Sequence, residues 1–160
     1  MNRRLLLGCV AAAAFASLAA LGGRAAGLPS CDPGNGGLTL PDGFCAKVVA
    51  DGLGPLRHLV VAPNGDVFVA MRSRGARGGG VIALRDINAD GTLDQQERFG
   101  QGSATGIALR NGYIYYATPT SVVRYKLPAG QLKPQGEMET VVAGLPQQNG
   151  TGGSDSLSWR

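Results

Sequence analysis

The sequence predicts an all-β protein built from a repeated unit of short strands, and three observations support this prediction. The 160-residue chain contains 26 glycines and 9 prolines, and only 16% of its residues are charged. Glycine and proline destabilise helices, so this composition favours many short elements joined by tight turns. Strand-like apolar runs alternate with turn residues, and no segment carries a sustained helical period. The same order of runs then occurs a second time.

The first 26 residues have the anatomy of a secretory signal peptide. Two arginines precede an Ala-rich apolar run over residues 5–21, and small residues offer cleavage sites between positions 19 and 26. An uncleaved membrane anchor is the alternative, but a run this rich in Gly and Ala is weakly hydrophobic for a stable span. We expect a periplasmic or secreted protein with a mature domain over residues 27–160 and no stable membrane span after cleavage.

The formal net charge of +4 comes mostly from this leader. Three arginines lie within residues 1–26, and without them 12 basic side chains stand against 11 acidic ones. A nearly neutral mature chain lacks the excess of positive charge that polyanion binding requires. We therefore expect no nucleic-acid partner.

The cysteines fit an exported protein. Cys9 belongs to the predicted leader, which leaves Cys31 and Cys45 in the mature chain. An even pair in an oxidising compartment predicts one disulfide. This bond would pin the tail at residues 32–37 against a first predicted strand at residues 44–50.

Two hairpins follow, one in each copy of the repeat. The first surrounds a Pro-Asn-Gly-Asp turn at residues 63–66, and the second surrounds Asn111 and Gly112; both are strong turn signals between apolar runs. Gly65 and Gly112 are 47 residues apart, and residues 139–146 echo residues 48–54. The predicted strands are, in chain order, residues 44–50, 58–62, 67–71, 81–85, 106–110, 113–117 and 121–125.

This repeat length predicts the architecture. A unit of 40–50 residues with about four strands is the signature of a β-propeller blade. An immunoglobulin-like sandwich also uses short strands but does not explain the repeated order of hairpin and strands. The sequence therefore predicts an incomplete β-propeller: about two to two and a half four-stranded blades after the signal peptide, truncated before the ring closes.

Four motifs carry a family resemblance that spans residues 31–146. The motifs are LTLPDGFC at 38–45, ADGLG at 50–54, RHLVVAPNGD at 57–66 and ALRD at 83–86. In their order and spacing they resemble the start of the sorbosone dehydrogenase-type proteins, which are PQQ-dependent sugar (pyranose) dehydrogenases. The resemblance implies a six-bladed ring with pyrroloquinoline quinone (PQQ) over its channel, a Ca²⁺ that polarises the quinone oxygens, and a sugar substrate.

The resemblance also implies a histidine base soon after a Gly-Leu-Pro turn. The corresponding residues here, 147–160, contain no histidine. A general base is a requirement for the hydride chemistry of this family. We therefore expect the N-terminal part of an exported sugar dehydrogenase, inactive on its own.

Two neighbouring residues are the candidates for contact with the cofactor or substrate. His58, the only histidine in the chain, is a weak candidate for a replacement base; the alternative is a hydrogen-bonded strand residue. Arg57 would pair with a carboxylate of the cofactor, and the alternative is a surface or inter-blade salt bridge.

One metal-binding motif is intact. Residues 86–97 match the calcium-loop pattern D-x-[DN]-x-[DN]-G-x₅-E. Strand-like residues precede the loop and no amphipathic helix follows it, unlike in an EF-hand, so a bound Ca²⁺ would be structural. The alternative is a metal-free hairpin whose Asp and Asn side chains cap the turn. The candidate ligands are Asp86, Asn88, Asp90, the carbonyl of Thr92, Asp94 and Glu97.

A second function from another class stays open. A propeller fragment without catalytic activity would bind a partner or associate with other copies through an exposed edge strand.

Overall fold

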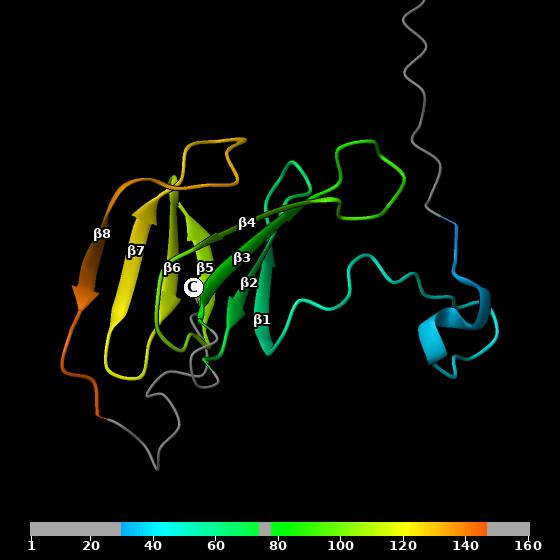
Figure 1. Cartoon of the computed structure of the whole chain (residues 1–160), viewed down its shortest axis with the longest axis horizontal. Coiled ribbons are helices and arrows are strands. Elements are labelled where there is room, and N and C mark those ends of the chain that lie inside the picture. The colour runs from blue at the N-terminus through cyan, green and yellow to red at the C-terminus, as the bar shows by residue number, and fades with distance from the viewer. Residues whose placement is uncertain (1–29, 74–77, 147–160) are drawn as a thin grey trace, which may run out of the picture.

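The chain folds into two antiparallel four-stranded sheets, which confirms the all-β prediction (Figure 1). The computed structural model describes residues 30–73 and 78–146. Each sheet keeps its strands in chain order. The first sheet contains β1 (Leu56–Val61), β2 (Val67–Met71), β3 (Gly80–Arg85) and β4 (Gln95–Phe99), and the second contains β5 (Ile107–Arg110), β6 (Tyr113–Ala117), β7 (Val122–Lys126) and β8 (Gln135–Val142).

The remainder of the described chain is loops and one short 3₁₀ turn, η1 (Pro33–Gly37). The predicted signal peptide at residues 1–26 lies outside the described residues, and so does the segment 147–160. Within the part of the chain that the structure describes, no helix has the length and apolar character needed to cross a bilayer.

The two hairpin turns form where the sequence predicts them. In the second, Asn111 and Gly112 both have positive φ, 51° and 76°, as a two-residue type I′ hairpin turn requires. In the first, the N–H of Gly65 donates to the carbonyl of Ala62 at 2.9 Å, and Gly65 has a φ of 91°. Gly65, Asn111 and Gly112 tolerate this left-handed backbone, which explains their places in the two turns.

The strand predicted at residues 44–50 is wrong, because this segment joins neither sheet. Its backbone groups bond instead to the tail before it: the N–H of Val48 donates to Asp32 Oδ2 at 2.7 Å, and the N–H of Ala46 to Asn35 Oδ1 at 3.2 Å. Local side-chain acceptors thus replace the strand partner.

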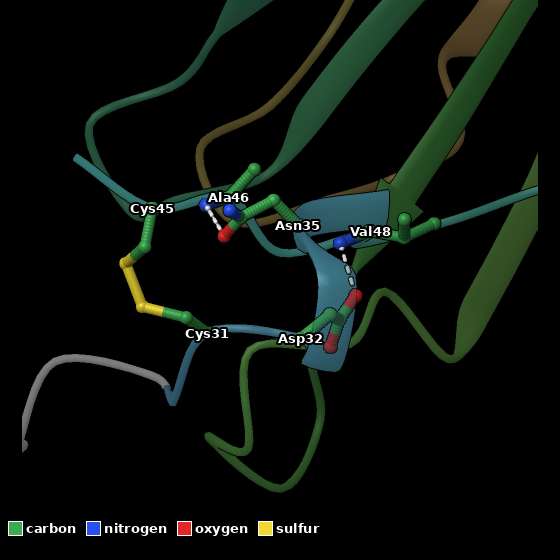
Figure 2. The surroundings of a disulfide bond; sticks show 6 residues. All are labelled: Cys31, Asp32, Asn35, Cys45, Ala46 and Val48. Atoms are coloured by element: carbon green, nitrogen blue, oxygen red, sulfur yellow. Dashed lines mark hydrogen bonds between the residues drawn. A yellow bond between two sulfur atoms is a disulfide. The ribbon is translucent and has the colours of Figure 1, made fainter. Parts of the chain in front are cut away.

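The predicted disulfide is confirmed. Cys31 and Cys45 are bonded, with their Cα atoms 5.8 Å apart, and the bond closes the loop that carries η1 (Figure 2). The Asp32 and Asn35 side chains lie inside this loop and point at the backbone beyond Cys45 (Figure 2). The disulfide therefore fixes the start of the N-terminal segment, which we define as residues 44–55.

A shared core joins the two sheets. One face of the first sheet carries Phe68 opposite Ala83 and Ala70 opposite Val81. This face packs against Ile114 and Tyr116 of β6 and their neighbours, and all of these residues are buried. Burial raises the pKa of Tyr116 to about 12. Alternate residues of β2 and β3 therefore hold the second sheet in place.

The opposite face of the first sheet, which we call the outer face, is also apolar. Val69, Met71, Ile82 and Leu84 lie on it and are buried beneath Leu53 of the N-terminal segment. From β4, Arg98 secures this cover, because its Nη2 donates to the carbonyl of Leu53 at 3.1 Å.

The first prediction concerns the shared core. We expect Phe68→Ala to lower the free energy of unfolding by about 3–5 kcal/mol, because the Phe68 side chain is 1% exposed and its removal leaves a cavity between the sheets. Phe44→Ala is the matched control: Phe44 is 71% exposed, so the same truncation should change stability by less than about 0.5 kcal/mol. Urea unfolding followed by far-UV circular dichroism measures both, and equal losses would contradict the shared core.

Candidate functional site

Arg57 and His58 lie at an irregularity in β1. Leu56 pairs with Met71 and Leu59 with Val69, so the two residues between them form a bulge in the ladder. Both are exposed. Bulges re-aim side chains and are common next to functional sites. Neither side chain bonds to another residue in the described ranges, so the salt bridge and the hydrogen bond considered as alternatives are not formed there.

The calcium-type loop brings together part of its predicted ligand set. Carboxylate oxygens of Asp86, Asp90 and Asp94 lie within 4.8 Å of one another. Glu97 is not in this cluster, because it belongs to β4 and pairs with Ala83. The bidentate ligand that closes an EF-hand loop is therefore held in the sheet.

Hydrogen bonds within the loop already use much of its acceptor capacity. Asp86 accepts from the N–H groups of Ala89 and Gly91, both at 2.7 Å, and from Asn88 at 3.2 Å. Asp90 accepts from the N–H of Thr92 at 2.7 Å, and this bond lowers the pKa of Asp90. These contacts form the capped turn that the sequence offers as the metal-free alternative.

The two candidate sites lie at opposite ends of the first sheet. The register pairs Leu56 with Met71 and Val81 with Phe99 at one end, next to Arg57 and His58. The calcium-type loop joins β3 to β4 at the other end, after Arg85. A metal held by the Asp cluster would therefore be remote from Arg57 and His58.

A third polar cluster escaped the sequence analysis. Asp66 is buried and forms a bidentate ion pair with Arg85, at 2.7 Å to Nε and 2.6 Å to Nη2. Arg85 Nη2 also donates to the carbonyl of Gly130 at 2.7 Å, in the loop after β7. The hydrogen bonds from Arg85 are the main cause of the lowered pKa of Asp66. This cluster ties the first sheet to a loop of the second.

A cleft of about 360 Å³ lies beside this ion pair, between the turns of the two hairpins. Phe68, Leu109 and Leu127 supply apolar walls, and Asn64 and Gln131 supply amides. The described residues that line it include no pair of ionisable groups arranged as a nucleophile and base.

The tyrosines of β6 have different environments. Tyr116 is in the shared core, whereas Tyr113 lies under the guanidinium of Arg124, whose Cζ is 4.2 Å from the ring centroid. The hydrogen bond from Arg124 to Tyr115, followed by its pairing with Glu139 at 2.6 Å, raises the pKa of Arg124. One face of the Tyr113 ring is thus already occupied by a cation.

The second prediction concerns Asp66. Because the pKa of Asp66 is lower in the folded chain than in the unfolded one, its ionised form stabilises the fold above about pH 4, and this stabilisation is lost as the pH falls through the lowered value. We expect Asp66→Asn to cost roughly 2–3 kcal/mol at pH 7 and progressively less on acidification. Chemical unfolding from pH 7 to pH 3 measures this, and a pH-independent difference would contradict it.

The third prediction distinguishes turn capping from metal binding in the loop. Without Ca²⁺, Asp86→Ala should lower the melting temperature by about 2–4 °C, because three backbone N–H groups lose their acceptor. Asp94→Ala is the control, and it should leave the melting temperature unchanged. A rise in the wild-type melting temperature on addition of CaCl₂, absent in both variants, would show instead that the cluster binds the ion.

Comparisons of the chain with family models, with curated proteins and with solved structures give no match in any of the three. Function is therefore inferred from the residues and from their arrangement.

Proposed function

We propose that the chain supplies neighbouring blades of an exported β-propeller, the N-terminal part of a PQQ-dependent sugar dehydrogenase of the sorbosone type. The 47-residue repeat carries this proposal, because both copies form a four-stranded antiparallel meander, the order of strands in a propeller blade. The two meanders also pack face to face through a continuous core, as blades do.

Arg57 supports the choice of an anionic cofactor. Its guanidinium is exposed at the bulge of β1, the first strand of its sheet, which corresponds to the innermost strand of a blade. A second arginine, Arg72, follows β2 at the same end of the sheet. Its backbone N–H donates to the carbonyl of Pro55 at 2.9 Å. PQQ carries carboxylates, and guanidinium groups bind carboxylates through paired charge-assisted hydrogen bonds.

The described residues fit only this part of a quinoprotein site. A Ca²⁺ beside the quinone needs several oxygen ligands close to Arg57, but the acidic cluster among the described residues lies at the far end of the sheet. His58 is the one imidazole in the chain, and it has no described carboxylate partner to orient it as a base. We therefore assign cofactor contact to Arg57 and derive no catalytic step from this chain.

The fourth prediction tests cofactor binding. Arg57→Ala should weaken PQQ binding by the chain roughly tenfold, about 1.4 kcal/mol, as measured by quenching of intrinsic fluorescence. Lys126→Ala is the control. Lys126 is the last residue of β7 in the second sheet and pairs with Tyr113, so this variant removes a cation away from Arg57. Equal losses in the two variants would indicate non-specific attraction of an anion and would contradict the assignment.

The same preparation tests the absence of catalysis. With PQQ and Ca²⁺ added, we expect no sugar-dependent dye reduction by this chain. Robust reduction that is lost in His58→Ala would contradict this expectation and would make His58 the base.

A non-catalytic binding or assembly module is the second candidate function. The observation in its favour is the group of exposed apolar residues on β1, Leu56, Leu59 and Val61, which lies on an edge strand of the first sheet. Exposed apolar groups of this kind mark interaction surfaces.

A further inference from the structure

Residues 46–50 have the sequence of a strand but not the pairing of one. Their Val-Val-Ala run at residues 48–50 recurs at residues 141–143, which is 93 residues later and close to two lengths of the 47-residue repeat. In the later copy both valines belong to β8, the last strand of its sheet, and Val142 pairs with Val122 of β7. The repeat therefore assigns residues 46–50 to the position of a fourth strand, although they pair with no strand among the described residues.

The disulfide loop, which we define as residues 31–45, takes the place of the missing strand. The N–H of Asp32 donates to the carbonyl of Ala46 at 2.9 Å, and Asp32 Oδ2 accepts from the N–H of Val48 at 2.7 Å (Figure 2). Backbone groups two residues apart face the same edge of an extended chain. These bonds therefore block the edge that a neighbouring strand would use.

This blocked edge depends on the disulfide. Asp32 and Val48 are 16 residues apart in the chain, so without a cross-link the entropy of loop closure opposes their contact. No residue of η1 is buried, so burial does little to hold the loop. Cys31 and Cys45 are both exposed, and a thiolate can therefore reach the bond between them.

We propose that the disulfide loop is a reducible cap on residues 46–50. When it is oxidised it keeps these residues from pairing as a strand, and when it is reduced it frees them to add to the edge of an antiparallel sheet. The partner is thus a sheet edge with unpaired backbone groups, which is what β7 offers to the equivalent residues of β8. The proposal goes with the second candidate function and is independent of cofactor binding by Arg57.

A dithiol carries out the reduction by thiol–disulfide exchange. The bond between Cys31 and Cys45 breaks, and both residues become thiols with two protons from the dithiol. The dithiol is oxidised and closes into a disulfide of its own. The shared core contains none of residues 46–50, so the segment opens without unfolding the two sheets.

A lysine-specific endoproteinase measures this opening, because the chain contains only three lysines and Lys47 is the one in the capped segment. Dithiothreitol should accelerate cleavage after Lys47 at least about tenfold, because a protease needs a locally open chain. Cleavage after Lys126, the last residue of β7, is the internal control and should keep its rate.

Two alanine variants separate the cap from the loop around it. Asp32→Ala removes the acceptor of the Val48 N–H and keeps the disulfide, so cleavage after Lys47 should be about threefold faster or more without reductant. Asp42 is the matched control, because it is an exposed carboxylate in the same loop that accepts no hydrogen bond from the described residues. Asp42→Ala should be cleaved like the wild type.

Sedimentation velocity measures the pairing, with the sheet edges of other copies of the full chain as the probe. The wild-type chain should associate when dithiothreitol is present and remain monomeric when it is absent. Val48→Pro should be cleaved as readily in the reduced state but should not associate, because proline has no N–H to donate to a strand partner.

Four results would overturn the proposal: an unchanged rate of cleavage after Lys47 on reduction, an equal acceleration after Lys126, equal rates for Asp32→Ala and Asp42→Ala, or a reduced wild-type chain that stays monomeric. Association of reduced Val48→Pro like the wild type would also contradict it, because the contact would then lie elsewhere. None of these results bears on PQQ binding, which the Arg57 variant measures separately.

Discussion

The structure depends on covering both faces of two central strands. Every residue of β2 from Phe68 to Met71 is buried, and in β3 burial extends from Gly80 to Leu84. Because side chains alternate along a strand, burial on this scale requires a layer on each side of the sheet. The second sheet provides one layer through the shared core. The N-terminal segment provides the other, although it is a single extended stretch of chain.

The contacts that hold the N-terminal segment follow from this requirement. A lone extended segment has few contacts of its own, and the structure anchors it at several points. The disulfide and the Asp32 side chain fix its start, Lys47 Nζ donates to the carbonyl of Asp90 at 2.8 Å, and Arg98 holds Leu53. These anchors cover the centre of the outer face, whereas a four-stranded sheet would also reach β1. The exposure of Leu59 and Val61 is the consequence.

Local signals explain which parts of the fold the sequence predicts. Both hairpins follow from Asn-Gly turns between apolar runs, and the disulfide follows from an even pair of cysteines. The β4 strand escapes prediction because Gln95–Phe99 is polar and has no clear alternation; its pairing with β3 is what makes it a strand. Residues 44–50 are instead predicted to be a strand and are not one, again because hydrogen-bond partners elsewhere in the chain decide the outcome. Their valines suit a strand, but Asp32 and Asn35 satisfy the backbone groups that would pair with one.

The candidate sites also differ in whether they depend on neighbours in sequence or on strand register. The capped turn at residues 86–94 depends on neighbours in sequence, so its spacing reveals it. The Asp66–Arg85 pair depends on register, since these residues are adjacent only when Val67 lies opposite Leu84. Register also determines that Arg57 and the acidic loop lie at opposite ends of the sheet. A shared family pattern is therefore weaker evidence for one composite site than the strand pairing, which places Arg57 at one end of the first sheet and the acidic loop at the other.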